Sequence, residues 1–329
     1  MTRPLVEALH RRPVERPPVW IMRQAGRYLP EYRRLREGRS FQECVSDPAL
    51  ASEITLQPIQ RFAMDGAVIF ADIMTPLEAM GVDMVFDPGP TLRPHEPGEI
   101  ARLGPLDPDR VGFVAETIRR VRAAVPDETA VIGFAGAPVT LLAYLLEGGG
   151  SKDFMRMRAA IRRDPEAVRA ALDRLAEAMA SYLRMQVDAG ADVVQLFDSW
   201  AGVLDGPRFS GFAVPAAQRA LAGIDAPRIY FAPGASHTLE RQREVGAEGY
   251  GVDWRLPIDV AWDRLGDVAV QGNLDPALLH ADPDTIRAGV EDLLDRTAGR
   301  PGHVVNLGHG IDRHTPPDHV GVLVEAVRS

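Results

Sequence analysis

Short apolar runs recur along the chain, and each ends at a polar residue, a glycine or a proline. Eight of them are four or five residues long and almost continuously hydrophobic, which is typical of strands covered on both faces of a parallel sheet. These eight runs are residues 19–22, 67–70, 131–134, 193–197, 228–231, 249–252, 268–271 and 304–307. The pattern therefore predicts eight parallel strands.

Segments with helical spacing separate these runs. Three of them start at an aspartate followed by proline, the pair favoured at a helix N-cap and at the first helical position. We expect those three helices at 48–62, from 165 to about 189, and over 282–298. The remaining helices are expected at 109–125, 210–223, 239–245 and 317–328, and Gly148 to Gly150 form a flexible joint between two helices.

Eight strands that alternate with helices predict a (β/α)8 TIM barrel, with residues 1–329 as a single domain. The alternative is an open, doubly wound sheet. No glycine-rich phosphate fingerprint follows the first strand, and this favours the barrel. Residues 84–93, which include Asp87-Pro-Gly-Pro90, are expected to form a small hairpin inserted after the second strand.

Charge and cysteine content narrow the function classes. The net charge of −9 argues against general nucleic-acid binding, although residues 23–39 hold six arginines and two glutamates. One cysteine, Cys44, allows no intrachain disulfide and too few ligands for a cysteine-based zinc site. No signal peptide or membrane-spanning run is apparent, so we expect a cytoplasmic protein without a membrane partner.

Polar residues follow almost every predicted strand. Active sites of (β/α)8 barrels lie at the carboxyl ends of the strands. A purely structural barrel needs fewer such groups, so we expect a site at this end. In chain order the candidates are Arg23 and Arg27, Asp72, Gly136 to Pro138, Asp198 to Trp200, Ser236 and His237, Asp253 and Trp254, Asn273 and Asp275, and His309.

Arg23 and Arg27 are four residues apart. If their loop is helical, both side chains lie on one face, about one turn apart. Guanidinium groups bind carboxylates or phosphates through two parallel hydrogen bonds. The alternative is two surface arginines in ion pairs, but their position directly after a buried strand favours ligand binding.

Asp72 follows an apolar strand, where a carboxylate needs a partner. It either accepts hydrogen bonds from substrate N–H groups and stabilises a developing cation, or caps a helix or pairs with an internal arginine. Tyr144, Ser199 and His309 have similar alternatives as a core tyrosine, a helix cap and a structural histidine. The glycines on both sides of His309 allow a ligand to approach the backbone closely.

Searches for other chemistry find no candidate. His303, His309, His314 and His319 do not have the spacing of a known metal motif. Lys152 is the only lysine and lies in no pyridoxal-phosphate or P-loop motif, so Schiff-base and P-loop chemistry have almost no candidate residue. We therefore expect neither a metal nor a cofactor.

Five motifs resemble the uroporphyrinogen decarboxylase family. They are PVWIMRQAGRYLPEY at 18–32, LQP at 56–58, IFADI at 69–73, GFAGAP at 133–138 and NLGHG at 306–310. The first motif is highly specific, and together they span most of the chain. Val139 stands where many members have tryptophan, and Tyr32 replaces phenylalanine; neither change affects an expected catalytic residue.

The resemblance implies a homodimeric (β/α)8 barrel that uses no metal and no organic cofactor. The implied reaction removes CO2 from the four acetate side chains of uroporphyrinogen III and gives coproporphyrinogen III in haem and tetrapyrrole biosynthesis. The substrate carries eight carboxylates and four pyrrole N–H groups. It is the one partner that the resemblance implies besides a second copy of the chain.

The same resemblance assigns roles to residues of these motifs and, outside them, to Tyr144 and Ser199. The catalytic residues would be Asp72, Arg23 and Arg27, with Asp72 accepting hydrogen bonds from the pyrrole N–H groups. The groups that bind substrate carboxylates would be the side chains of Arg23, Arg27, Arg36, Tyr144, Ser199 and His309, with backbone groups of Gln24, Ala25 and Gly26 close by.

Two other functions remain as alternatives. A methyltransferase of the same superfamily acts on corrinoid-bound or thiol substrates through a zinc site with Cys and His ligands, but Cys44 lies in an early helical region far from any strand end. A non-catalytic tetrapyrrole-binding protein would keep the arginines without needing Asp72, whose presence favours catalysis.

Overall fold

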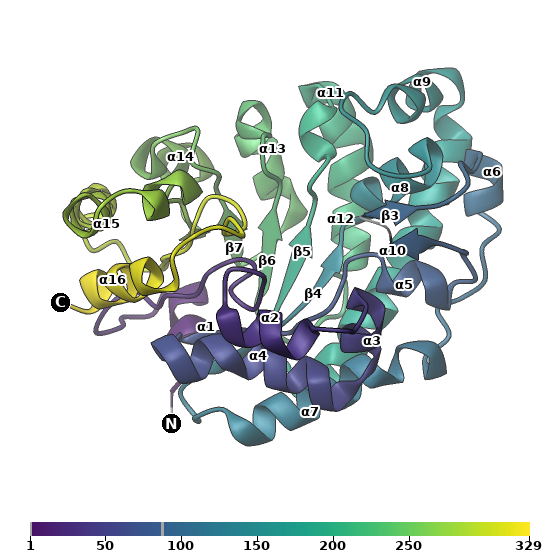
Figure 1. The fold of residues 1–329 in the computed structure, drawn as a ribbon. Helices are drawn as coiled ribbons and strands as arrows, with labels where there is room; N and C mark the ends of the chain where they lie inside the picture. The colour runs from purple at the N-terminus through teal and green to yellow at the C-terminus, as the bar shows by residue number, and fades with distance from the viewer. Residues whose placement is uncertain (1, 87–88) are drawn as a thin grey trace.

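A curled parallel sheet forms the centre of the computed structural model, which describes residues 2–86 and 89–329 (Figure 1). Its seven strands run in the order β1-β4-β5-β6-β7-β8-β9. They are β1 Gly66–Val68, β4 Ala130–Gly136, β5 Val193–Phe197, β6 Arg228–Phe231, β7 Gly249–Gly251, β8 Ala269–Gln271 and β9 His303–Val304. Seven of the eight predicted strands are therefore present, with small differences at their ends.

The remaining predicted strand, 19–22, is the first along the chain, and it is present only as a single bridge. Val19 pairs in parallel with Val305 beyond β9, and the Asp65 N–H donates to the Val19 carbonyl at 2.9 Å just before β1. This segment fills the gap between the two edge strands and closes the barrel. The strand stops early because the chain turns at once, with the Gln24 N–H donating to the Ile21 carbonyl.

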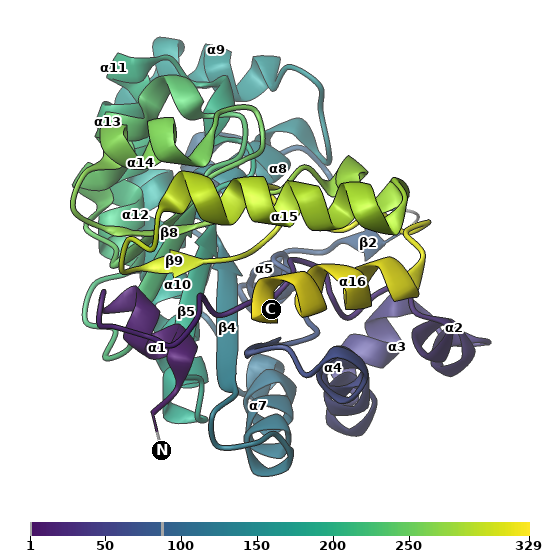
Figure 2. The same cartoon turned by 90° about the vertical axis from the view of Figure 1, so that its left-hand side faces the viewer.

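Helices surround this sheet, as Figures 1 and 2 show from two directions. The α-helices are α1 Pro4–Leu9, α2 Pro30–Arg36, α3 Phe41–Ser46, α4 Pro48–Phe62, α5 Thr75–Ala79, α6 Pro97–Ile100, α7 Gly112–Ala124, α8 Pro138–Glu147, α9 Met155–Arg163, α10 Pro165–Asp188, α11 Gly206–Arg208, α12 Val214–Ala220, α13 Leu239–Gln242, α14 Ile258–Leu265, α15 Pro283–Thr297 and α16 Pro317–Arg328. None of the helices within residues 2–86 and 89–329 combines the length and apolarity needed to cross a membrane.

The predicted helix starts are confirmed at the three aspartates. Asp47, Asp164 and Asp282 each accept at least one backbone N–H at the N-terminus of α4, α10 and α15, and a proline follows each of them. Two other predicted helices are less regular. Residues 210–223 contain a π-helical turn, η3 Phe209–Ala213, before α12, and residues 239–245 end in a 3-10 turn, η5 Arg243–Val245.

Helix α1, which the sequence pattern did not predict, lies across the amino-terminal end of the barrel (Figure 2). Leu5 and Leu9 are fully buried there with Trp20 and the inward-facing side chains of several strands. A Cβ at Gly249 would lie 2.6 Å from Leu9, so β7 needs glycine at that point. The barrel is therefore filled at the end opposite to the predicted site.

The predicted hairpin is confirmed as β2 Val85–Phe86 and β3 Pro90–Thr91, which pair antiparallel. Asp87 and Pro88, which were expected in its turn, lie outside the described residues. Thr91 also bridges to Gly149, and the Leu92 N–H donates to the Gly148 carbonyl. The three-glycine joint between α8 and α9 is thus attached to the hairpin.

Asp65 fastens the closing segment to β1. Its carboxylate accepts the Val19 N–H at 2.7 Å and pairs with both terminal nitrogens of Arg16 at 2.8 and 2.9 Å. Asp65 is buried, so removing its carboxylate would leave the Val19 N–H and the Arg16 charge without their partner.

We predict that Asp65→Ala lowers the free energy of unfolding by about 2–3 kcal/mol, the range for a hydrogen-bonded charged group. Urea unfolding followed by circular dichroism measures the change. The matched control is Asp318→Ala, which removes an exposed partner of Arg61 and should shift the free energy by less than about 0.5 kcal/mol. Equal effects of both variants would contradict the role of Asp65 in closure.

Candidate active site

A tight turn after the closing segment carries the first two candidate residues. The Met22 N–H donates to Asn306 Oδ1, and the Met22 carbonyl accepts the Ile311 N–H. The fully buried Gln24 side chain accepts the Ile21 N–H and donates to the Gly66 carbonyl. Three parts of the chain therefore hold this turn in place.

Arg23 and Arg27 do not share a helical face, because the loop between them is not helical, the condition on which that arrangement depended. Arg23 has a left-handed backbone with φ of 65°, and no helix spans the two residues. The Arg23 side chain lies against Gly310, where a Cβ would come within 2.5 Å of Arg23 Cδ. Arg27 instead lines a separate groove, so the turn sends the two guanidinium groups to different places.

Asp72 lies after β1, in the turn that leads into α5. Its Oδ1 atom accepts the Met74 N–H at 2.8 Å, but Met74 is itself the N-cap of α5, so Asp72 orders the turn before the helix and does not cap it. Oδ2 accepts no hydrogen bond from the residues that the structure describes, and the side chain keeps part of its surface accessible. One oxygen is thus fixed by the backbone while the other is left for a ligand.

The surroundings of Asp72 favour its neutral form. Burial raises the pKa of Asp72 to about 6, against the opposing effects of the Met74 N–H and of the Arg23 charge. The charges of Arg23 and Asp72 both act on the pKa of Tyr144, which is raised mainly by burial. Arg23 also helps lower the pKa of His309, after burial as the main cause. Arg23 is therefore within electrostatic reach of Asp72, Tyr144 and His309, and we call the region around these four residues the cleft.

Aromatic side chains form two sides of this cleft. On one side Trp200 contacts Tyr144 edge-to-face at 6.0 Å between ring centroids and packs against Phe154 at 4.7 Å. On the other side His309 contacts Trp254 edge-to-face at 6.1 Å, and the Arg255 guanidinium lies 4.0 Å over the Trp254 ring. Rigid apolar walls reduce the solvation of charges between them.

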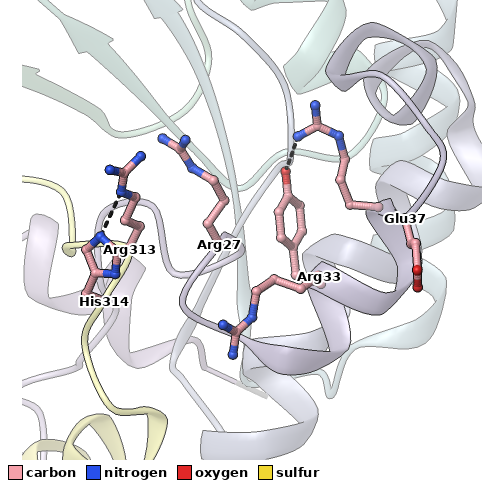
Figure 3. A pocket seen from close by; sticks show the side chains of 7 residues that line it. Arg27, Arg33, Glu37, Arg313 and His314 are labelled. Atoms are coloured by element: carbon pink, nitrogen blue, oxygen red, sulfur yellow. Dashed lines mark hydrogen bonds between the residues drawn. The ribbon is translucent and has the colours of Figure 1, made fainter. Parts of the chain in front are cut away.

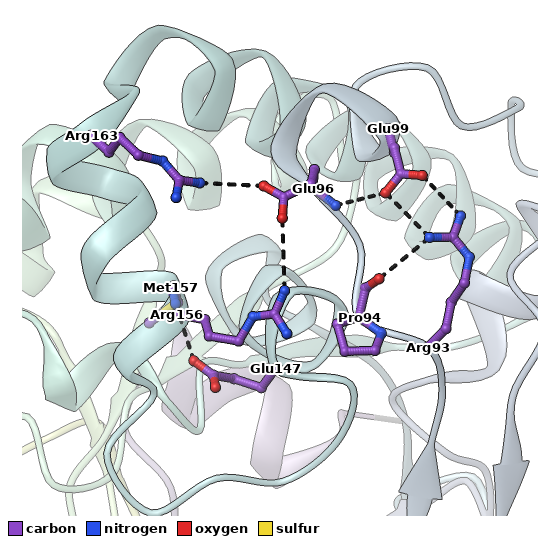
Figure 4. A network of polar contacts seen from close by, with 8 residues as sticks. All are labelled: Arg93, Pro94, Glu96, Glu99, Glu147, Arg156, Met157 and Arg163. Carbon is purple, nitrogen blue, oxygen red and sulfur yellow. Dashed lines mark hydrogen bonds and ion pairs between the residues drawn. The ribbon is translucent and has the colours of Figure 1, made fainter.

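A surface network holds the Phe154 side of the cleft in position (Figure 4). Glu96 pairs with Arg156 and Arg163 of α9, and Glu147 at the end of α8 accepts the Met157 N–H at 3.1 Å. Glu96 itself donates its backbone N–H to Glu99. The start of α9, and with it Phe154, is thereby tied to the segment after the hairpin.

The other predicted binding groups are placed as follows. Ser199 lies between Asp198 and Trp200, and its hydroxyl makes no hydrogen bond with the described residues, so it does not act as the helix cap considered for it. Gln24 uses its side chain and its N–H to hold the turn. The backbone N–H groups of Ala25 and Gly26 donate to no acceptor within the part of the chain that the structure describes, so they are available to a ligand.

Several strand-end residues have structural roles instead. Asp253 accepts the N–H groups of Gly234 and Arg255, and Asn273 donates to the carbonyls of Asp253 and Leu256. Asp275 caps the turn η6 Pro276–His280. The excess of polar groups at this end is therefore partly explained by the loops that they hold.

One buried network was not predicted from the sequence. Thr140 donates to Asp198 Oδ1 at 2.9 Å, Tyr230 donates to Asp198 Oδ2 at 2.7 Å, and the Trp200 N–H donates to Thr140. Burial raises the pKa of Asp198 to about 6. These contacts fix the loop that carries Ser199 and Trp200. The available signal was the aspartate at the end of the 193–197 run, but its partners are distant in sequence.

A groove lined by residues of α2, of the turn before it and of the loop before α16 is shown in Figure 3. This groove has a volume of ≈ 460 Å³ and does not include Asp72, Tyr144 or His309. It contains two of the predicted residues, Arg27 and Arg36, and five that were not predicted: Tyr32, Arg33, Glu37, Arg313 and His314. We call it the arginine groove.

Together these features define what the site can do. The cleft offers one guanidinium, one carboxylate with a free oxygen, a tyrosine and a histidine, which suit an anionic ligand that also carries N–H donors. Among the described residues no three His, Cys, Asp or Glu side chains come together as metal ligands, and Cys44 is buried in α3.

The sequence model of the family described as "Uroporphyrinogen decarboxylase (URO-D)" matches residues 2–329. Proteins described as "Uroporphyrinogen decarboxylase" from Myxococcus xanthus and Roseiflexus sp. are 45% and 44% identical to this chain. The alignments cover 98% and 97% of this chain and 95% and 96% of those proteins. A third such protein, from Chloroflexus aggregans, is 42% identical over 98% of this chain and 94% of its own length.

Among solved structures, one described as a methyltransferase from Methanosarcina mazei superposes with a TM-score of 0.82. It covers 98% of this chain and 97% of its own, with 22% sequence identity. A likeness at this identity shows the shared fold alone.

We predict that Asp72→Asn raises Tm, and that the gain is larger at pH 8 than at pH 4.5. The pKa of this carboxyl is about 3.9 in an unfolded chain and about 6 in the folded protein. Ionisation therefore costs stability, a cost that is absent below the unfolded pKa and complete above the folded one. Asparagine keeps the contact to Met74 without the charge.

Thermal unfolding of both proteins across this pH range measures the effect. Asp282→Asn is the control, because the pKa of Asp282 is lowered by its contacts to Thr285, so its stabilisation is already present at pH 4.5. That variant should lose a small, nearly constant amount of Tm. A gain for Asp72→Asn that does not depend on pH would refute the raised pKa.

Proposed function

Because this chain belongs to the uroporphyrinogen decarboxylase family, we propose that the cleft at the carboxyl end of its barrel removes CO2 from the four acetate side chains of uroporphyrinogen III. The product is coproporphyrinogen III, and the chain is a carboxy-lyase of haem and tetrapyrrole biosynthesis. The observation that carries the proposed site is Asp72, which has one oxygen fixed by the backbone and one without a protein partner.

The chemistry requires a place for an electron pair. When the bond between the acetate methylene and its carboxylate breaks, CO2 leaves and two electrons remain on the methylene carbon. Protonation of the adjacent pyrrole ring beforehand makes the ring a cation that accepts them. A proton then adds to the methylene carbon and the ring loses its extra proton, so each acetate becomes a methyl group with a net uptake of one proton.

Asp72 stabilises the ring cation. Its free oxygen accepts pyrrole N–H groups, whose hydrogen bonds strengthen when the ring becomes positive. A fixed carboxylate in a poorly solvated cleft favours this charge more than water would, since it needs no reorganisation. Burial makes the ionised form of Asp72 less stable, and its raised pKa reflects this cost.

Arg23 lies in the same cleft as Asp72 and binds the reacting acetate. Either Arg23 or a water molecule delivers the proton to the pyrrole ring. Arg27 and Arg36, in the arginine groove, bind carboxylates that do not react. The N–H groups of Ala25 and Gly26 add uncharged donors beside them.

Tyr144, Ser199 and His309 complete the set of donors to carboxylates. Burial together with the charges of Arg23 and Arg255 lowers the pKa of His309, so near neutral pH this imidazole donates a hydrogen bond without a positive charge. The Ser199 hydroxyl has no competing partner among the described residues. We also infer a cytoplasmic homodimer that binds no nucleic acid, supported by the resemblance and by the net charge of −9.

The alternatives have less support. The methyltransferase interpretation requires zinc ligands, and the described residues bring no suitable group of side chains together. A non-catalytic tetrapyrrole-binding protein could lack Asp72, so its presence favours catalysis. In such a protein the arginines alone would bind the ligand.

We predict that Asp72→Asn lowers kcat by ~10² to 10³, the usual effect of losing one preorganised electrostatic group. Anaerobic incubation with uroporphyrinogen III and quantification of CO2 and of the partly decarboxylated products measures it. In the wild type, kcat/KM should fall as the pH drops below about 6, where Asp72 becomes protonated. The control Asp282→Asn changes an exposed helix cap and should keep full activity. Turnover by Asp72→Asn within threefold of the wild type would remove Asp72 from the mechanism.

We predict different kinetic effects for the two arginines. Lysine keeps the charge but loses the paired hydrogen bonds of guanidinium. Arg23→Lys should mainly lower kcat, because Arg23 shares the cleft with Asp72, whereas Arg27→Lys should mainly raise KM. Steady-state kinetics under anaerobic conditions distinguish the two outcomes. Unchanged constants in both variants would mean that neither side chain contacts the substrate.

A further inference from the structure

The arginine groove holds four arginines, of which the proposed function uses only Arg27 and Arg36. Arg33 and Arg36 come from α2, and Arg313 and His314 come from the loop between Gly310 and α16. Figure 3 shows Arg27 and Arg313 extending in the same direction, with Glu37 on the far side of the groove. Among the described residues that line the groove, Glu37 is the only acidic one.

The arginines of this groove lack carboxylate partners in the part of the chain that the structure describes. Within residues 2–86 and 89–329, Arg27, Arg33, Arg36 and Arg313 form no ion pair. Arg36 donates to the Tyr32 hydroxyl at 3.2 Å, and Arg313 donates to His314 Nε2 at 3.0 Å. Elsewhere on the surface arginines are commonly paired, as Arg228 is with Glu248. Four unpaired like charges around one groove repel each other, and an anion between them relieves that repulsion.

The position of the groove connects it to the cleft. Arg27 is four residues from Arg23 in the same turn, and Arg313 follows Gly310, on which the Arg23 side chain lies. A volume of ≈ 460 Å³ is within the usual range for small-molecule sites. Two short stretches of chain, from Arg23 to Arg27 and from Gly310 to Arg313, therefore link the groove to the cleft.

We propose that Arg33 and Arg313, with His314, form an outer anion site that captures the rim carboxylates of the tetrapyrrole before an acetate enters the cleft. This inference rests on the proposed function, which supplies a ligand with eight carboxylates. Only some of them face the cleft when one acetate reacts, and the others need a counter-charge outside it. The outer site provides it.

The kinetic signature of such a site follows from its role. It raises the rate of association through long-range attraction, which salt weakens, and it makes no contact that is special to the transition state. Its loss therefore lowers kcat/KM and the salt dependence of kcat/KM, while kcat stays the same.

The test compares the wild type with the double variant Arg33→Gln/Arg313→Gln, at low and at physiological ionic strength. We expect kcat/KM at low salt to fall about tenfold, the lower end of electrostatic steering, with kcat within twofold of the wild type. Arg33→Lys/Arg313→Lys keeps both charges and should retain the wild-type salt dependence. Both residues are exposed, so folding is not at risk, and circular dichroism verifies it.

The control is Arg119→Gln/Arg120→Gln, which removes the same charge from the exposed face of α7, where Glu116 already pairs with both arginines. This variant should change kcat/KM by less than twofold. An equal effect of both double variants would mean that net charge alone matters and would overturn the outer site. A parallel fall in kcat for Arg33→Gln/Arg313→Gln would also overturn it, because the groove would then take part in the reaction.

A binding measurement separates this inference from the proposed function. Oxidised uroporphyrin, which keeps the eight carboxylates but cannot react, is titrated into each protein and followed by its fluorescence. If Arg33→Gln/Arg313→Gln is the one variant that binds uroporphyrin more weakly, the outer site is supported. This holds even if the wild type shows no turnover, a result that would contradict only the proposed decarboxylation. Equal Kd values in all the proteins, together with normal turnover in the wild type, would overturn the outer site only. Inorganic pyrophosphate and benzenehexacarboxylate are then compared as competitors of uroporphyrin. If pyrophosphate displaces uroporphyrin at the lower concentration, the groove is a phosphate site and the carboxylate assignment is overturned.

Discussion

The hydrogen bonds on either side of Met22 fix the turn that carries Arg23 and Arg27. They attach the turn after the closing segment to Asn306 and Ile311, while Gln24 attaches it to β1. In this frame Arg23 takes a left-handed backbone and extends along Gly310 into the cleft. Arg27 then leaves the turn on the other side. Barrel closure and the separation of inner and outer charges are thus consequences of one short segment.

Two aspartates at this end of the barrel are largely buried, so their charged forms have lost much of their solvation. Asp72 and Asp198 both have raised pKa values because they are buried, but they differ in how their oxygens are used. Both oxygens of Asp198 accept hydrogen bonds from the protein, so this residue holds a loop. One oxygen of Asp72 has no such donor. The same physical cost therefore serves structure in one case and ligand chemistry in the other.

The sequence predicts those parts of the fold that local signals determine. Aspartate followed by proline marks the starts of α4, α10 and α15, and apolar runs mark the strands. Helix α1 was not predicted because its apolar residues are buried only once the barrel has closed and its end can pack against them. The site was predicted in part, since the motifs identify Arg23, Asp72 and His309, but the left-handed Arg23 and the unpaired arginines depend on contacts between distant segments. The spacing of Arg23 and Arg27 could not decide their relation, because it depended on whether the loop is helical, and it is not.

The attachment of the hairpin to the glycine joint has a consequence for how this barrel can vary. Thr91 and Leu92 contact Gly149 and Gly148, and the same joint leads to Phe154, which packs on Trp200 beside Tyr144. A hairpin of different length would shift that aromatic stack through the backbone, without any change of residue in the cleft. In chimeric proteins built from two relatives, the hairpin and the α8–α9 connection should therefore be taken from the same parent.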